Sequence, residues 1–101
     1  MNTDELVAYG RSRFEHAAAR RTLKEKYQAK MTFGWNGGMF KTTPEMITFL
    51  SLYNNERIVI LDLYETPIEV NAKELCDLMK MRLQEQMNAW LVEYTDLSQN
   101  R

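Results

Sequence analysis

The last third of the chain carries the strongest structural constraint. It is an apolar stripe at helical spacing that predicts a helix longer than a compact small domain. Asn71 and Glu74 form a capping-box pattern at its start, and the stripe continues to about residue 97. Its members are Leu75, Leu78, Met79, Leu83, Met87, Trp90, Leu91, Tyr94 and Leu97. A helix of this length spans about 40 Å, whereas a compact 100-residue domain has a radius of gyration of about 13 Å. We therefore expect the helix to extend beyond the globular body.

Residues 3–30 predict a second long helix, at the opposite end of the chain. Asn2 or Thr3 can cap it, and Asp4 and Glu5 place negative charge in its first turn, where the helix dipole favours it. Its apolar stripe is thin, and Gly10 costs about 1 kcal/mol relative to alanine. Because so little apolar surface is available for burial, we expect half of this helix to project or to pack on another chain.

The middle of the chain predicts two hairpins and a short helix. Asn36-Gly37-Gly38 separates residues 32–35 from residues 39–41 and supplies the positive φ angles of a tight turn. Thr42 or Thr43 caps a helix with Pro44 at its first position. Residues 57–63 read as a strand, and residues 68–70 as a shorter one after a bend. The predicted order is α-ββ-α-ββ-α. This is a small single α+β domain with a basic helix over residues 1–30 and a compact body over residues 31–101 that ends in the long amphipathic helix.

Composition narrows the chemistry that the chain can perform. The single cysteine, Cys76, cannot form an internal disulfide, and its apolar and acidic neighbours favour a buried, inert thiol. The single histidine, His16, has no companions at metal-ligand spacing, so we predict neither a metal site nor a cofactor. No apolar run approaches the length of about 18 residues needed to span a bilayer, and the acidic start is unlike a signal peptide. We expect a protein of a reducing compartment that has no membrane contact.

Charge is unevenly distributed along the chain. Residues 1–30 carry seven Lys/Arg against four Asp/Glu (+3), whereas residues 31–101 carry six against ten (−4), which together give the net charge of −1. The candidates for binding a partner are Arg13, Arg20, Arg21 and Lys24. We favour pairing of these cations with acids of the last helix, then a protein partner, and then nucleic acid. The basic run lacks the interleaved aromatic residues of single-strand binders.

Two further groups of residues have both a functional and a structural interpretation. Trp35 and Phe40, on the first hairpin, could anchor a partner or pack in the core, and we slightly favour the core. Asp62 and Glu65 follow a strand and could act as an acid–base pair, but turn capping is favoured because no histidine, nucleophile or metal ligand accompanies them. We therefore assign no catalytic residue and expect no enzymatic activity.

Three segments carry a resemblance to known proteins: FKTTPEMITFL at residues 40–50, IVILDLYETPI at residues 58–68 and QEQMNAWLVEY at residues 84–94. Over residues 39–97 the chain resembles small, mostly uncharacterised proteins of large contractile-tailed (myovirus-type) bacteriophages, including cyanophages. The resemblance implies a viral protein that builds the virion or takes over the host, in the cytoplasm of the infected bacterium or in the virion. It transfers no functional residue to this chain.

Three functional hypotheses follow. The first is a non-enzymatic phage structural or virion-assembly protein that forms oligomers through its long helices. Its seam would consist of Leu83, Met87, Trp90, Leu91 and Tyr94, which form the most continuous apolar face. The second is a small phage regulator that binds a host protein or nucleic acid through the basic helix. The third is a small-ligand binding protein that uses the Asp62–Glu65 region and the aromatic hairpin.

Overall fold

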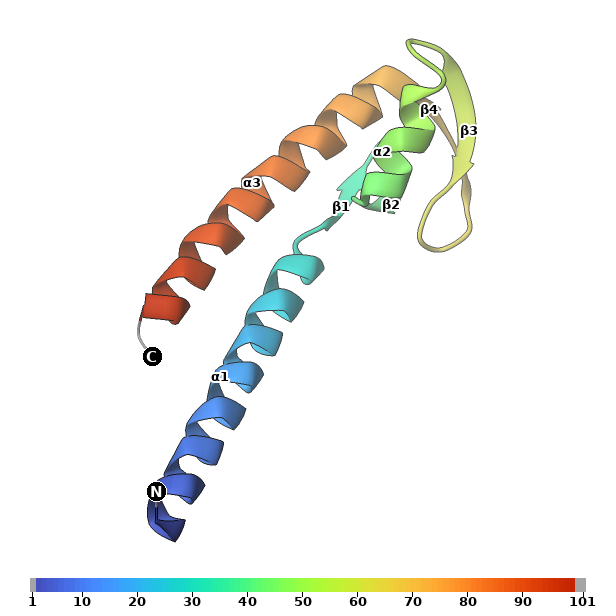
Figure 1. Cartoon of the computed structure of the whole chain (residues 1–101). Coiled ribbons are helices and arrows are strands. Elements are labelled where there is room, and N and C mark those ends of the chain that lie inside the picture. Colours follow the sequence, from blue (N-terminus) through green and yellow to red (C-terminus); the bar gives the residue numbers. More distant parts are fainter. Residues whose placement is uncertain (1, 100–101) are drawn as a thin grey trace.

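The computed structural model of the chain describes residues 2–99 and confirms the predicted α+β fold and its order of elements (Figure 1). The helices are α1 (Thr3–Ala29), α2 (Pro44–Ser51) and α3 (Ala72–Gln99). The strands are β1 (Thr32–Trp35), β2 (Gly38–Lys41), β3 (Arg57–Leu61) and β4 (Pro67–Asn71). The predicted boundaries of the two long helices differ from the observed ones by no more than two residues at the ends that the structure describes.

Side-chain caps begin all three helices at residues that the sequence marks. In α1, Asn2 Oδ1 accepts a hydrogen bond from Glu5 N at 2.8 Å, and the Glu5 carboxylate accepts one from Asn2 N at 3.2 Å. Thr43 Oγ1 accepts from Met46 N at 3.1 Å to begin α2. Asn71 Oδ1 accepts from Glu74 N at 3.0 Å to begin α3. Each cap satisfies a backbone donor that the first turn of a helix leaves without a partner.

The four strands form two separate antiparallel hairpins. In the first, Phe33 pairs with Phe40, and the turn uses positive φ angles at Asn36 (52°) and Gly37 (82°). Gly38, the third residue of the predicted turn, instead begins β2. In the second hairpin, Ile60 pairs with Ile68, and β4 begins at Pro67, which has no N–H to donate. A backbone hydrogen bond from Leu63 N to Met39 O, 2.8 Å long, joins the two hairpins.

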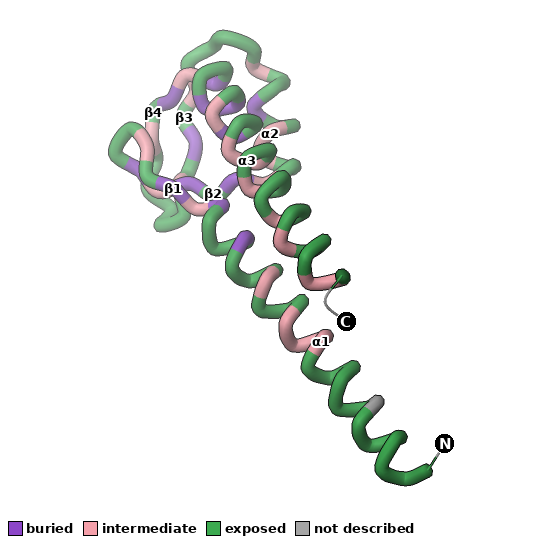
Figure 2. Tube along the Cα trace, turned by 90° about the vertical axis from the view of Figure 1, so that its left-hand side faces the viewer, coloured by how far each residue is buried: buried purple, intermediate pink, exposed green. Residues whose placement is uncertain are grey.

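The core lies where the hairpins and α2 pack against the first half of α3. It contains Phe33, Phe40, Leu50, Ile60, Val70, Ala72, Leu75, Cys76 and Met79. Figure 2 shows that the buried residues gather in this body, whereas both long helices are mostly exposed or half-buried as they leave it. The apolar stripe of α3 is thus fully buried only in its first half.

The molecule is strongly elongated because α1 and α3 leave the body side by side (Figure 1). Its dimensions are 65 × 24 × 19 Å, and its radius of gyration is 19.4 Å, well above the value of about 13 Å expected for a compact chain of this length. The prediction that the long helices extend beyond the body is confirmed. We call α1 together with residues 83–99 of α3 the arm.

Candidate interaction surface

The two long helices run antiparallel, and an aromatic stack and polar contacts join them near the base of the arm. The rings of Tyr27 and Trp90 are stacked, with centroids 6.0 Å apart and planes 8° apart. Lys26 Nζ forms an ion pair with Glu93 Oε1 at 2.7 Å, and Arg82 donates to the backbone oxygen of Lys30 at 3.3 Å. These contacts fix which residues of α1 lie level with which residues of α3.

The ion pair changes the titration of both its members. The hydrogen bond with Glu93 raises the pKa of Lys26, and the same bond lowers the pKa of Glu93. Desolvation raises the pKa of the adjacent Tyr27. Both charged side chains remain 40% or more exposed, so solvent screens the pair and it orients the helices more than it stabilises them.

The four candidate cations of α1 lie on the surface of the arm. Arg13, Arg20, Arg21 and Lys24 are all exposed. Within residues 2–99, Arg20, Arg21 and Lys24 have no ion pair and no side-chain hydrogen bond. An ion pair between α1 and the last helix forms at Lys26 and Glu93, next to the candidate cations, whereas the predicted pairing is not seen for Arg20, Arg21 and Lys24 within residues 2–99.

The structure divides the predicted seam of α3 into a covered part and an open part. Leu83 and Trp90 are half-buried, and Trp90 packs on Tyr27 of its own chain. Met87 is 42% exposed, Tyr94 40% and Leu91 63%. Because α1 already covers Trp90, the surface that remains for another molecule centres on Met87, Leu91 and Tyr94.

A groove of about 460 Å³ continues the open part of the seam toward the body. Met31, Leu83, Met87 and Trp90 supply its apolar lining. Its other wall consists of residues 41–45, which run from the last residue of β2 into the first turn of α2. Gln28 and Gln84 also line the groove. Sequence reasoning missed this wall, because no pattern in residues 41–45 indicates that they lie beside α3.

The first part of α1 extends past the end of α3. Tyr27 lies beside Trp90, so moving four and then eight residues along both helices places Leu23 level with Tyr94 and Ala19 level with Ser98. Residues 3–15 therefore lie beyond Gln99, the last described residue of α3. In this segment Leu6 and Val7 are each 55% exposed and Phe14 is 72% exposed. About half of α1 thus projects in this single chain, in line with the expectation that this half would project or pack on another chain.

The prediction that Phe40 is a candidate anchor for a partner is wrong. Phe40 is only 2% exposed, and its ring packs against Phe33 and Trp35 with centroid distances of 6.2 and 6.3 Å. The physical reason is strand alternation, since every second side chain of β2 points toward the core. Trp35 is half-buried and packs on the edge of this cluster. The interpretation of this pair as core residues is confirmed for Phe40.

Asp62 caps a turn, as predicted. Its Oδ1 accepts from Tyr64 N at 2.9 Å and from Thr66 N at 3.0 Å, and its Oδ2 accepts from Met39 N at 3.1 Å. Hydrogen bonds from Thr66 and Met39 hold the pKa of this carboxyl below its usual range. Glu65 occupies a positive-φ position (60°) in the same turn. These bonds give Asp62 a structural role in joining the two hairpins.

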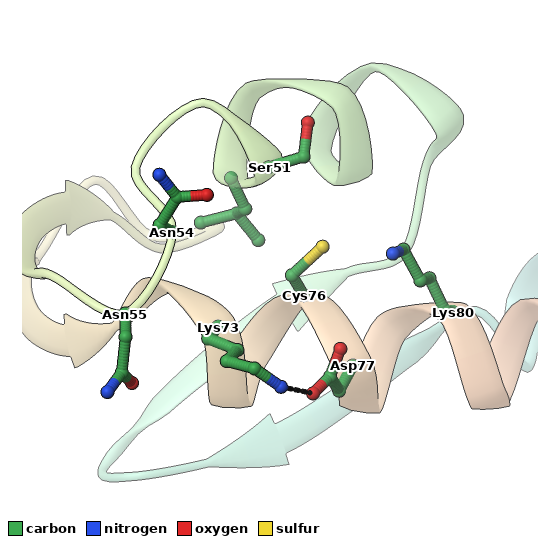
Figure 3. Close-up of a pocket in the computed structure, with 8 residues that line it drawn as sticks. Ser51, Asn54, Asn55, Lys73, Cys76, Asp77 and Lys80 are labelled. Carbon is green, nitrogen blue, oxygen red and sulfur yellow. Dashed lines mark hydrogen bonds and ion pairs between the residues drawn. The ribbon is translucent and has the colours of Figure 1, made fainter.

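A second hollow lies between α2 and α3, nearer the start of α3 than the groove (Figure 3). Its volume is about 440 Å³, and Ser51, Asn54 and Asn55 line it opposite Lys73, Cys76 and Lys80. Lys73 Nζ forms an ion pair with Asp77 Oδ2 at 3.0 Å along one wall. Cys76 is 4% exposed and its thiol lies 3.6 Å from Ile47 O, which confirms the predicted buried cysteine.

Residues 2–99 contain no group of three or more His, Cys, Asp or Glu side chains placed to hold a metal ion. In the same part of the chain, no helix combines the length and the apolar character needed to cross a membrane. No protein family, no curated protein and no solved structure matches the chain.

Proposed function

We propose that this chain is a non-enzymatic protein that works through protein–protein contacts and self-associates through its arm. One observation carries the proposal: the arm presents large apolar side chains that the rest of the described chain leaves at least 40% exposed. They are Leu6, Val7, Phe14, Met87, Leu91, Val92 and Tyr94, each between 40% and 72% exposed. Burying apolar surface contributes about 25 cal/mol of favourable free energy per Å² removed from water. Concentrations of exposed apolar side chains on a protein surface therefore mark interaction sites.

The setting that we propose is the assembly of a bacteriophage virion, in the infected host's cytoplasm or in the particle itself. The resemblance of residues 39–97 to small proteins of contractile-tailed phages supports this setting. A narrow arm on a small body also suits an assembly component, because its helices can pack against neighbouring subunits while the body keeps its own core.

The oligomeric state of the full chain tests the proposal. We expect a mass above the monomer value of 12.0 kDa at tens of micromolar in sedimentation experiments. Two double variants test the two exposed parts of the arm: one changes Leu91 and Tyr94 to serine, and the other changes Leu6 and Phe14 to serine. At least one of them is expected to lower the association. The matched control changes Val59 and Leu61 to serine, since these are 65% and 60% exposed on β3, away from the arm. A wild-type monomer at this concentration would contradict the proposal, and so would association that neither arm variant lowers more than the control does.

A second candidate is a small regulator that binds a host protein or nucleic acid through α1. The observation that favours it is that Arg20, Arg21 and Lys24 are exposed and make no ion pair within residues 2–99. Electrophoretic mobility shifts with DNA and RNA over a range of salt concentrations test the nucleic-acid form. Binding should weaken steeply with salt and disappear when the three residues are changed to glutamate. Binding that survives these changes would contradict it.

A further inference from the structure

The projecting segment of α1 carries features that complement each other within one short helix. Its acidic first turn, Leu6 and Val7 lie toward the free end, and the small residues 17–19 and Arg20 and Arg21 lie nearer the body. We infer that residues 3–21 pair antiparallel with the same segment of a second copy of this chain. The inference rests on the proposed function, and it names the partner and the surface.

Most of the segment is open to a partner because it lies beyond Gln99, the last residue of α3 that the structure describes. At 1.5 Å per residue, residues 3–15 extend about 20 Å beyond that point. Figure 1 shows this end of α1 reaching past the C-terminal end of α3. A second helix can therefore lie alongside the part of the segment that α3 does not reach.

The apolar contacts favour an antiparallel register. Val7 and Phe14 are seven residues apart and so lie on one face of the helix, as in a coiled-coil seam. In an antiparallel pair centred near residue 12, Val7 of one copy lies level with Ala17 and Ala18 of the other. Small side chains there leave room for the larger one, and the symmetry makes the contact twice.

Gly10 also indicates an external partner at this place. A Cβ built at Gly10 meets no atom of the described chain within 4 Å, so the monomer has no steric need for glycine. Glycine nevertheless weakens an exposed helix relative to alanine. In the antiparallel register Phe14 of the second copy lies level with Gly10 and Arg11, where a missing side chain allows the helices to approach closely.

Charge complementarity selects a second copy in this orientation. The register that places Val7 beside Ala17 also brings Asp4 beside Arg20 and Arg21 of the other copy, once at each end. Neither arginine has an ion pair within residues 2–99 of its own chain. A parallel pair would instead place Asp4 beside Asp4 and Arg21 beside Arg21. Arg11 and Arg13 lie near the two-fold axis and oppose pairing, so the two end contacts and the Phe14 contacts must outweigh their repulsion.

Charge reversal in the full-length chain tests the inference. Asp4→Arg and Arg21→Asp are each expected to raise the dimer dissociation constant at least about tenfold, because each places like charges together. The double variant exchanges the two charges, so its constant should return to within about threefold of wild type. Sedimentation equilibrium at low salt measures the constants, and circular dichroism reports whether α1 remains helical. The inference would be overturned if the single variants had the dissociation constant of the wild type, or if the double variant dimerised more weakly than both single variants.

Gly10→Leu provides a second test that does not depend on charge. Leucine favours the helix more than glycine, so helicity should rise while the dimer weakens at least about tenfold. A dimer that is unaffected by Gly10→Leu would count against the register.

The outcomes also separate this inference from the proposed function. Self-association that is lost on changing Leu91 and Tyr94 but survives every change in residues 3–21 would overturn the inference and leave the proposed function standing. A wild-type monomer would overturn both.

Discussion

At the scale of single residues, Tyr27 decides how the arm is joined. It is a large side chain on α1 that is 2% exposed, and it meets both Trp90 and the cations around it. Lys26 and Lys30 place their ammonium groups 5.2 and 5.1 Å from its ring centroid. A tyrosine suits this position because its ring provides apolar area and a negative face for cations at the same time.

Tyr27→Ala is therefore expected to destabilise the protein by about 3 kcal/mol, the cost typical of removing a buried aromatic ring. Urea unfolding followed by circular dichroism measures the change. Tyr64→Ala serves as the control, since Tyr64 is 75% exposed and its loss should stay within about 0.5 kcal/mol. Equal losses in the two variants would show that Tyr27 does not join the helices.

Asp62 is expected to make stability depend on acid pH. Its folded pKa is lowered by backbone donors, so its stabilising effect is complete above the unfolded value of about 3.9. That effect is lost as the pH falls through the lower folded value. Asp62→Asn should therefore lower the melting temperature at neutral pH and change it less at acid pH. A melting difference that is the same at pH 7 and pH 2.5 would contradict this role.

At the scale of elements, the turn of the first hairpin contains one residue other than glycine with a positive φ angle. Asn36 has φ of 52°, and its side-chain amide donates to Glu69 O at 2.8 Å. Asparagine tolerates the left-handed region better than most residues do, and here its side chain also ties the first hairpin to the second.

Asn36→Ala is expected to cost about 1–2 kcal/mol, because alanine is strained at positive φ and cannot donate the hydrogen bond. Asn36→Gly separates the two causes, since glycine adopts this angle freely but also lacks the donor. Thermal unfolding should place the glycine variant between wild type and the alanine variant. If both variants lose the same stability, the backbone angle contributes nothing.

Protection from hydrogen exchange should differ between two segments of α1. Residues 23–29 pack on α3 and should exchange slowly, whereas residues 3–15 should exchange fast in dilute solution because little apolar contact holds them. At concentrations where the chain dimerises, protection of residues 3–15 should rise. Exchange measured by mass spectrometry at two protein concentrations checks this. Protection of residues 3–15 that is high and independent of concentration would contradict the description of a free segment.

At the scale of the whole molecule, the separation of body and arm predicts the shape of the dimer. An antiparallel pair of α1 segments places the two bodies at opposite ends. Small-angle scattering should therefore give a maximum dimension clearly above the monomer length of 65 Å. A dimer no longer than the monomer would mean that the arms lie side by side along their whole length, which contradicts the antiparallel register.

The sequence by itself determined the local structure of this protein. The caps at Asn2, Thr43 and Asn71, the turn at Asn36 and Gly37 and the apolar stripe of α3 are all set by interactions between residues close in the chain. Propensity, capping and turn geometry act over a few residues, so the order of the elements could be predicted, and their bounds to within about two residues: the strand predicted over residues 57–63 ends at Leu61. Turn capping by Asp62 follows from the same local chemistry.

Only the tertiary structure decided which faces are covered. The predicted seam treats residues 83–94 as one surface, but α1 covers Trp90 and leaves Leu91 exposed. Burial of Phe40 and the wall formed by residues 41–45 likewise depend on which distant segment lies opposite. The physical reason is that a periodic pattern identifies an apolar face but not its partner. That choice depends on contacts between residues far apart in the chain, such as Tyr27 with Trp90 and Lys26 with Glu93.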